Sequence, residues 1–101
     1  RLAARLAALK LGREPVVGVL AVRGIALVVA MLGILRAGAV YLPLDTRAAT
    51  RRTLIILGSS GCVLVLRDAA CTAVGDELQR DPGWPRHVAC LTLEEEGQAD
   101  A

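Results

Sequence analysis

The sequence predicts an α/β fold in which a parallel β-sheet of about three to four strands is flanked by helices. Two observations predict it. Segments with helical periodicity and short apolar runs alternate along the chain in the order helix, strand, helix, strand, helix, strand. The apolar runs at 16–22 and 62–66 also contain no polar position, which is typical of strands covered on both faces, as in a parallel sheet.

The first predicted helix, residues 1–11, is amphipathic and ends at Gly12, its expected C-cap. Three of its leucines are spaced four and three residues apart on one face: Leu2, Leu6 and Leu9. A turn leads from this helix into the predicted strand at 16–22, which is broken by the Arg23-Gly24 pair.

Residues 25–36 form the second predicted helix, which ends at Gly38. Its side chains are apolar nearly all around the helical wheel, and such a helix is typically sandwiched between two layers. Gly38 suits the end of the helix because glycine adopts the left-handed conformation without steric cost. The next predicted strand, at 40–44, is stopped by Pro43 and Asp45.

The third predicted helix covers residues 46–57, and Asp45 is its expected cap through the backbone N–H groups two and three residues on. Its outer side is expected to carry Arg47, Arg51 and Arg52, and its inner side Leu54, Ile55 and Leu57. The run Gly58-Ser59-Ser60-Gly61 is expected to end the helix, and the strand at 62–66 follows.

The pattern is weaker beyond Arg67. Residues 68–79 predict a short helix, and the two prolines in 80–86 predict a turn. Residues 87–93 predict a fourth strand, and the acidic end at 94–101 is expected to fray.

The composition limits the chain to one compact domain with an aliphatic core. It has 101 residues, 54% of them hydrophobic, with no Phe, one Trp and one Tyr. Aromatic side chains usually supply large blocks of buried area in a self-contained domain. Their scarcity here favours a piece of a larger structure.

The charge is distributed unevenly along the chain. Residues 1–67 carry ten Lys and Arg against two acids, and residues 68–101 carry two Arg against eight acids. The basic residues are scattered among apolar runs without the stacking aromatics that single-stranded nucleic acid prefers. Solvated helix faces are therefore the favoured interpretation, with partial neutralisation between the two halves, and no nucleic-acid partner is expected.

The cysteines and the apolar runs predict a reduced, cytoplasmic protein without a membrane segment. Cys62, Cys71 and Cys90 form no C-x-x-C pair and are expected to be free thiols. Within the apolar stretch 16–44, the longest uncharged run, 24–35, has 12 residues, against the roughly 20 that a membrane-spanning helix needs.

No residue is assigned a catalytic, cofactor-binding or metal-binding role. Gly33 and Gly38 have the spacing of a phosphate loop but lack the Lys and Ser or Thr that must follow. His87 and Cys90 lack further metal ligands. The other candidates fit structural roles better: Ser59 and Ser60 as a helix end, Lys10 on a wet helix face, and Trp84 as a cover for the core edge.

One stretch resembles a known family. The residues Leu35-Arg36-Ala37-Gly38-Ala39-Val40-Tyr41-Leu42-Pro43-Leu44-Asp45 are similar to the motif L-[KR]-A-G-x-x-Y-[LV]-P-[LI]-D of nonribosomal peptide synthetase adenylation domains, which are adenylate-forming enzymes. The segments on both sides agree, with Arg52 and LIILGSSGCVLVL resembling R-L-x-x-x-L-x-D-S-G and a strand. The resemblance covers 1–66 well and 67–101 weakly, and identifies 1–101 as the N-terminal α/β portion of such a domain, truncated before the ATP phosphate loop.

The resemblance implies an activity for the parent family. That activity is the ATP- and Mg-dependent adenylation of an amino acid, followed by transfer to a carrier-protein thiol. The phosphate loop, the amino-acid pocket and the catalytic lysine of the family have no match here, so no cofactor and no catalysis are expected of this segment by itself. The sequence also departs from the family pattern, with Thr46, Ala48 and Ala49 in place of Pro, Tyr and Pro, and Ser59 in place of Asp.

Three hypotheses about function follow. The leading one is a scaffold or domain–domain interaction element that contacts neighbouring synthetase domains, or the remainder of the adenylation domain, through the apolar helix at 25–35; self-association into a homo-oligomer is an alternative use of this face. The second hypothesis is an excised fragment of an intact, active ligase. The third, a basic nucleic-acid-binding module, rests only on the charge of residues 1–67.

Overall fold

The computed structural model describes residues 2–9, 14–22 and 24–93. Within them a four-stranded, wholly parallel sheet has the strand order β2-β1-β3-β4. In chain order the elements are α1 (Leu2–Ala8), β1 (Val16–Leu20), α2 (Ile25–Arg36), β2 (Val40–Pro43), α3 (Thr50–Ser60), β3 (Cys62–Arg67), a 3₁₀ turn (Ala69–Cys71), α4 (Thr72–Arg80) and β4 (Ala89–Thr92). The predicted α/β class and the fourth strand are thereby confirmed.

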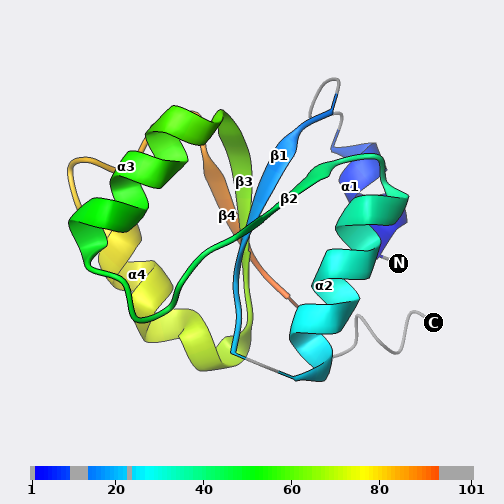
Figure 1. Cartoon of the computed structure of the whole chain (residues 1–101), viewed down its shortest axis with the longest axis horizontal. Coiled ribbons are helices and arrows are strands. Elements are labelled where there is room, and N and C mark those ends of the chain that lie inside the picture. Colours follow the sequence, from blue (N-terminus) through cyan, green and yellow to red (C-terminus); the bar gives the residue numbers. More distant parts are fainter. Residues whose placement is uncertain (1, 10–13, 23, 94–101) are drawn as a thin grey trace.

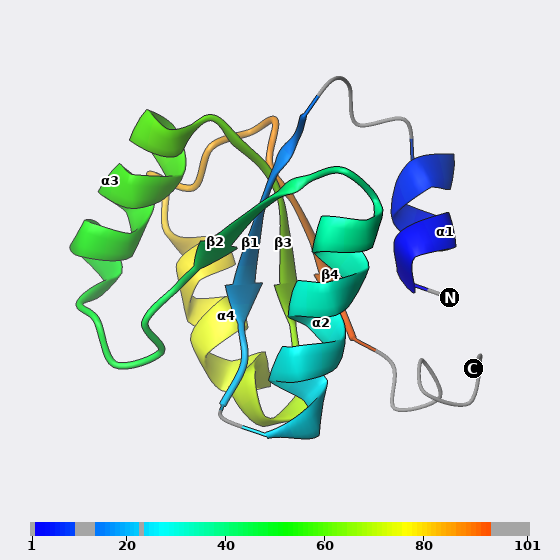
Figure 2. The same cartoon turned by 45° about the vertical axis from the view of Figure 1, so that its right-hand side comes forward.

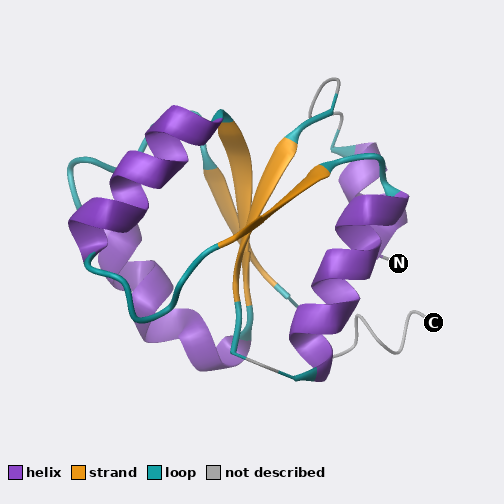
Figure 3. Ribbon diagram, viewed as in Figure 1, coloured by secondary structure: helices purple, strands orange, loops and turns teal. Residues whose placement is uncertain are grey.

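The helices lie in two layers, one on each side of the sheet. Figures 1 and 3 show α1 and α2 on one side and α3 and α4 on the other. Turned by 45°, the molecule shows α1 beside α2 (Figure 2), and these two helices are in contact. This three-layer arrangement covers the central strands β1 and β3 on both faces, which explains their uninterrupted apolar sequences.

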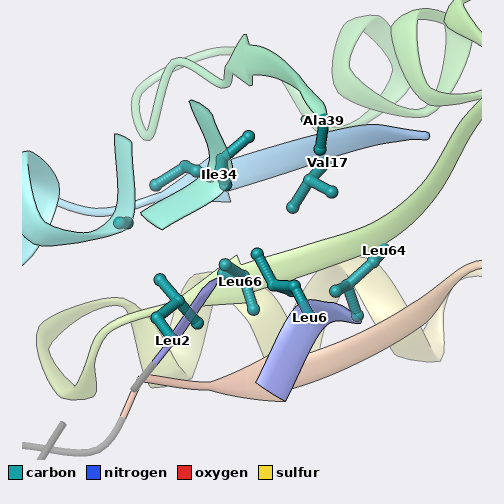
Figure 4. Close-up of a cluster of buried hydrophobic side chains, with 9 residues drawn as sticks. Leu2, Leu6, Val17, Ile34, Ala39, Leu64 and Leu66 are labelled. Carbon is teal, nitrogen blue, oxygen red and sulfur yellow. The ribbon is translucent and has the colours of Figure 1, made fainter. Parts of the chain in front are cut away.

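Each face of the sheet has its own aliphatic core. On the α1 and α2 side, Leu2 and Leu6 of α1 and Ile34 of α2 pack with Leu64 and Leu66 of β3 (Figure 4). The other core lies on the side of the sheet that α3 and α4 cover. Its buried residues are Leu20, Leu44, Leu57, Cys62, Val65, Cys71, Leu78 and Val88. Trp84 packs half-buried against this second cluster, as expected for a cover at the core edge.

Helix α2 has the predicted bounds, but one of its faces is open. Its Ala30, Gly33 and Ile34 are buried, whereas Ile25 keeps 79% of its surface exposed and Leu35 55%. The expectation that α2 is sandwiched between layers is therefore wrong for the described residues. Only one layer packs on the helix, and nothing described covers its opposite side.

Helix α3 is shifted relative to its prediction. It begins at Thr50 rather than at residue 46, because the Asp45 carboxylate accepts the backbone N–H of Arg47 in a tight turn and does not cap the helix. It continues to Ser60 and ends at Gly61 in the left-handed conformation, with φ 75°. Ile55, expected to face inward, is 60% exposed because Thr53 and Leu57, four residues apart, form the buried face.

The ends of the other elements differ by a few residues. Strand β1 ends at Leu20, because the N–H of Val22 is bonded to the carboxylate of Asp68 and no longer to a neighbouring strand. The segment predicted as one helix at 68–79 divides into the 3₁₀ turn and α4. The predicted cap at Gly12 and the predicted fraying at 94–101 lie outside the described residues.

Candidate functional site

Among the described residues, the side chains that carry reactive groups do not converge on a catalytic centre. No group of three or more His, Cys, Asp or Glu side chains in the described ranges could hold a metal ion. The hydroxyl groups of Ser59 and Ser60 donate to the carbonyls of Ile56 and Leu57, within the last turn of α3. The indole N–H of Trp84 donates to the carbonyl of Val88 at 2.9 Å. This hydrogen bond stabilises the loop that contains both residues.

The three cysteines are free thiols, two of them buried and Cys90 half-buried. Burial raises the pKa of Cys62 and of Cys90 above the ordinary value of a thiol. Burial is also the largest cause that raises the pKa of Cys71 to about 11, and a hydrogen bond with the Asp68 side chain adds to the rise. Nucleophilic thiols need the opposite shift, so these side chains act as small apolar groups.

The carboxylate of Asp68 lies between β1 and β3, where the strand order of the sheet reverses direction. Ligands of open α/β sheets bind at the carboxyl ends of the strands, and in this strand order the reversal lies between β1 and β3. Here the two oxygens of the buried Asp68 carboxylate accept the N–H of Val22 at 3.3 Å and the N–H of Cys71 at 3.0 Å. The backbone N–H of Asp68 donates to the carbonyl of Leu20 at 3.1 Å. The carboxylate therefore joins the two loops and occupies the position itself.

An open hollow lies beside the carboxyl ends of β1 and β2. Its volume is about 840 Å³, and its walls are formed by Ala21, Val22, Leu44, Asp45, Thr46 and Arg47. The carboxylate among these described lining residues, that of Asp45, already accepts the N–H of Arg47 at 2.9 Å. The described residues thus bring together no carboxylate cluster for Mg²⁺ and no glycine-rich cradle for the phosphates of ATP, and they do not fit either group.

The outer face of α2 is the feature best suited to an interaction. Four exposed apolar side chains follow one another at spacings of three, four and three residues, which keeps them in one stripe: Ile25, Val28, Leu32 and Leu35. The stripe lies on the side of α2 opposite to the buried Ala30 and Ile34. Arg36, at the last turn, is the charged residue of this helix.

Within the described residues, an ion pair between Arg67 and Asp76 joins the basic part of the chain, 1–67, to the acidic part, 68–101. Arg67 of β3 donates to the carboxylate of Asp76 in α4 at 2.8 Å and to the carbonyl of Thr72 at 3.2 Å. Its Nε also donates to the hydroxyl of Thr92 in β4 at 3.4 Å. This side chain ties β3, α4 and β4 together and is structural.

Sequence reasoning found the apolar helix but missed the role of Asp68. The available signal was an aspartate directly after a buried strand and directly before a helical segment, the usual place of an N-cap. Asp68 does cap the 3₁₀ turn, through the N–H of Cys71. Its contact with Val22, 46 residues earlier, depends on the tertiary fold and has no local signal.

Two relatives of known name, a synthase and a synthetase, are similar to this chain in sequence. The chain is 42% identical over 73 residues to a plipastatin synthase of Bacillus subtilis, covering 72% of this chain and 3% of that protein. It is 41% identical over 96 residues to the AMB antimetabolite synthetase AmbB of Pseudomonas aeruginosa, covering 95% of this chain and 7% of that protein. The chain therefore spans a small fraction of the length of these relatives.

Solved structures agree in fold. A Mycobacterium tuberculosis fatty acyl CoA synthetase superposes with a TM-score of 0.81 at 24% identity, over 96% of this chain and 20% of that one. A nonribosomal peptide synthetase, FmoA3, bound to α-methyl-L-serine-AMP superposes with a TM-score of 0.76 at 28% identity, over 90% of this chain and 10% of that one. The family model described as AMP-binding enzyme matches residues 1–101. The chain belongs to the AMP-binding enzyme family and corresponds to part of a nonribosomal peptide synthetase adenylation domain.

Proposed function

We propose that this chain is a scaffold segment of an amino-acid-activating adenylation domain and has no catalytic activity by itself. The complete domain would use ATP and Mg²⁺ to convert an amino acid to an aminoacyl-adenylate and would pass it to a carrier-protein thiol. The chain's share of this work is to present a rigid three-layer unit against which other parts of the synthetase pack. Its three free thiols are compatible with a reducing cytoplasm.

The observation that carries the proposal is the outer face of α2. A helix on a free protein surface normally directs polar side chains to the solvent. Here Ile25 is 79% exposed, Leu35 55%, Leu32 51% and Val28 48%. Burying such a side chain fully is worth about 1.5–3 kcal/mol, so covering the exposed part of each would stabilise a complex by on the order of 1 kcal/mol. This face therefore fits an apolar surface of the same synthetase.

The absence of catalysis is tested by pyrophosphate exchange. The 101-residue chain is incubated with ATP, Mg²⁺, a mixture of amino acids and labelled pyrophosphate. No label is expected to enter ATP, because the described residues do not fit the nucleotide or the metal ion. Exchange above the protein-free background would contradict the proposal and favour an active ligase.

The partner surface is tested in a chimera. The chain replaces the matching residues of the AMB antimetabolite synthetase AmbB, to which it is 41% identical, and adenylation is measured. Leu32→Glu, in the stripe, is expected to lower adenylation at least tenfold, because it places a charge in a buried apolar contact. Ile55→Glu is the matched control, since Ile55 is 60% exposed on a different helix.

The same substitution separates an interface from a core position. In the isolated chain Leu32→Glu is expected to change the free energy of unfolding by no more than about 0.5 kcal/mol, as for an exposed site. Ile34→Ala, two residues on and fully buried, is expected to cost about 2–5 kcal/mol. Equal effects of Leu32→Glu and Ile55→Glu on adenylation in the chimera would show that the stripe is not a contact surface.

A further inference from the structure

The backbone of Val22 is shared by two neighbouring features, the hollow beside β1 and β2 and the buried thiol of Cys71. Ala21 and Val22 follow the end of β1 and form part of the wall of that hollow. The N–H of Val22 donates to the carboxylate of Asp68 at 3.3 Å. The carboxylate of Asp68 and the backbone of Val22 both form hydrogen bonds with the side chain of Cys71, which is 2% exposed. The thiol is therefore shielded from solvent directly next to residues 21–22.

Few contacts hold residues 21–22 in place. Strand β1 ends at Leu20, whose carbonyl accepts the backbone N–H of Asp68 at 3.1 Å. Beyond Leu20, the small side chain of Ala21 packs partly buried against the core on the α1 and α2 side, and Val22 keeps 48% of its surface exposed. The bond from Val22 to Asp68 is longer than the range of about 2.7–3.2 Å that is usual for N–H···O bonds. A segment with so little buried apolar surface belongs to the part of a fold that opens at low free-energy cost.

The surroundings leave room for residues 21–22 to move. The hollow on one side of them is open and has a volume of about 840 Å³. Gly24 has no atom within 4 Å of the place where a Cβ would lie. The groups beneath are fixed more firmly, because the carboxylate and the carbonyl of Asp68 both accept the N–H of Cys71, at 3.0 and 3.1 Å. Movement is therefore expected in residues 21–22 and not in the turn after β3.

We propose that residues 21–22 form a strap that opens from Asp68 while both cores stay folded, and that this opening deepens the hollow as far as the Cys71 thiol. Opening breaks the hydrogen bond between Val22 and Asp68 and allows water to reach both groups. The deepened hollow is a minor state of the folded chain, as in other pockets that are closed in the major state. The proposal rests on contacts among described residues and does not depend on the adenylation function or on the outer face of α2.

The thiol of Cys71 reports the open state. Methyl methanethiosulfonate is added to the Cys90→Ser chain, because Cys90 is half-buried and would react first. The thiolate attacks the sulfenyl sulfur, the S–S bond of the reagent breaks, methanesulfinate leaves and a methyl disulfide forms on the cysteine, whose proton goes to solvent. Mass spectrometry follows Cys71 and Cys62, which is fully buried in the same core. Cys71 is expected to react at least about tenfold faster than Cys62, since local opening is more frequent than global unfolding.

Urea separates strap opening from unfolding. Well below the unfolding midpoint, the rate at Cys71 is expected to be nearly independent of urea, because the strap exposes little surface when it opens. The rate at Cys62 is expected to rise steeply, because it requires the whole chain to unfold. A common urea dependence of the two thiols would overturn the proposal, and so would complete protection of Cys71 up to the midpoint.

Asp68→Asn tests the bond that holds the strap. It removes the charged acceptor of the Val22 N–H and is expected to speed the reaction of Cys71 about tenfold. Asp81→Asn is the matched control, since Asp81 accepts the N–H of Gly83 in an exposed loop, and it should leave the rate at Cys71 unchanged. No acceleration of Cys71 in the Asp68→Asn chain would show that this bond does not hold the strap closed.

A substitution in the opposite core tests whether the cores stay folded. Ile34 is fully buried on the α1 and α2 side. Ile34→Val lowers the global stability mildly and is expected to speed the reaction of Cys62 about fivefold. The rate at Cys71 should not change, because strap opening leaves this core intact. Equal acceleration of both thiols would mean that Cys71 is reached only by global unfolding, which contradicts the proposal.

Discussion

Gly33 of α2 lies directly against the side chain of Leu2 in α1. A Cβ placed on Gly33 would be 2.7 Å from Cδ2 and 2.9 Å from Cγ of Leu2, closer than carbon atoms approach in folded proteins. Both residues are buried, and Leu2 belongs to the same core as Ile34. The glycine therefore permits the close packing of α1 on α2, the two helices on one side of the sheet.

Gly33→Ala is expected to destabilise the chain although alanine is the better helix former. The methyl group forces Leu2 out of place, and overpacking of this kind costs about 1–3 kcal/mol, against a gain of about 1 kcal/mol in helix propensity. We expect a net loss of about 1 kcal/mol in urea unfolding followed by circular dichroism. Gly58→Ala is the matched control, because a Cβ at Gly58 in α3 has no atom within 4 Å, and it should stabilise by about 0.5–1 kcal/mol.

A double variant identifies the cause of the Gly33 effect. If the clash with Leu2 is responsible, Gly33→Ala/Leu2→Ala will be less destabilised than the sum of the two single variants, with an interaction energy of at least about 0.5 kcal/mol. Additive effects would show that the added methyl group and Leu2 do not meet.

Asp68→Ala is expected to lower the free energy of unfolding by about 1–3 kcal/mol. It leaves the N–H of Val22 without its acceptor, which costs about 1–3 kcal/mol for a buried donor, whereas the N–H of Cys71 keeps its bond to the backbone carbonyl of Asp68. Asp68→Asn retains one acceptor oxygen and should lose about half as much. Asp81→Ala is the control, since its carboxylate accepts the N–H of Gly83 in an exposed loop; an equal loss there would refute the special role of Asp68.

The order of elements is predictable from the sequence because its signals are local. Helix α2 has the predicted bounds, since Gly24 and Gly38, both with positive φ, mark its two ends. The predicted start of α3 was wrong because Asp45 has the sequence signature of a cap, whereas its carboxylate accepts the N–H of Arg47 in the preceding turn. Local sequence signals thus indicate that a helix begins near this point, but they do not determine the residue at which it begins.

The candidate surface is predictable only in part. Apolar side chains all around 25–36 indicate contacts on two sides of the helix, but the sequence does not say which side the sheet takes. That choice depends on Ala30, Gly33 and Ile34 packing with α1 and the strands, which leaves the stripe from Ile25 to Leu35 outside.

The stability of the chain is expected to fall at alkaline pH, in part through Cys71. Its pKa is raised from 9.0 to about 11, chiefly by burial. Because the folded state holds the proton more tightly, this contribution is fully present below pH 9.0 and is lost as the pH rises to about 11. Urea unfolding between these pH values should show a shallower decline for Cys71→Ala than for the parent chain. Ser59→Ala, which removes no titrating group, should keep the parent slope; equal slopes for all three proteins would contradict the assignment.

Helix α3 is expected to gain stability from an acidic N-cap. Ala49 occupies the cap with φ −61° and ψ 144°, without a side-chain hydrogen bond, and no acidic residue lies in the first turn. Ala49→Asp supplies an acceptor for the free N–H groups and a negative charge at the positive end of the helix, together worth about 0.5–2 kcal/mol. Ala49→Glu brings the same charge on a side chain that is not a preferred N-cap and should gain less, and Ala49→Asn supplies the acceptor without the charge. Urea unfolding of the three variants separates the two contributions, and a gain that is equal for Asp and Glu would assign the effect to charge and not to capping.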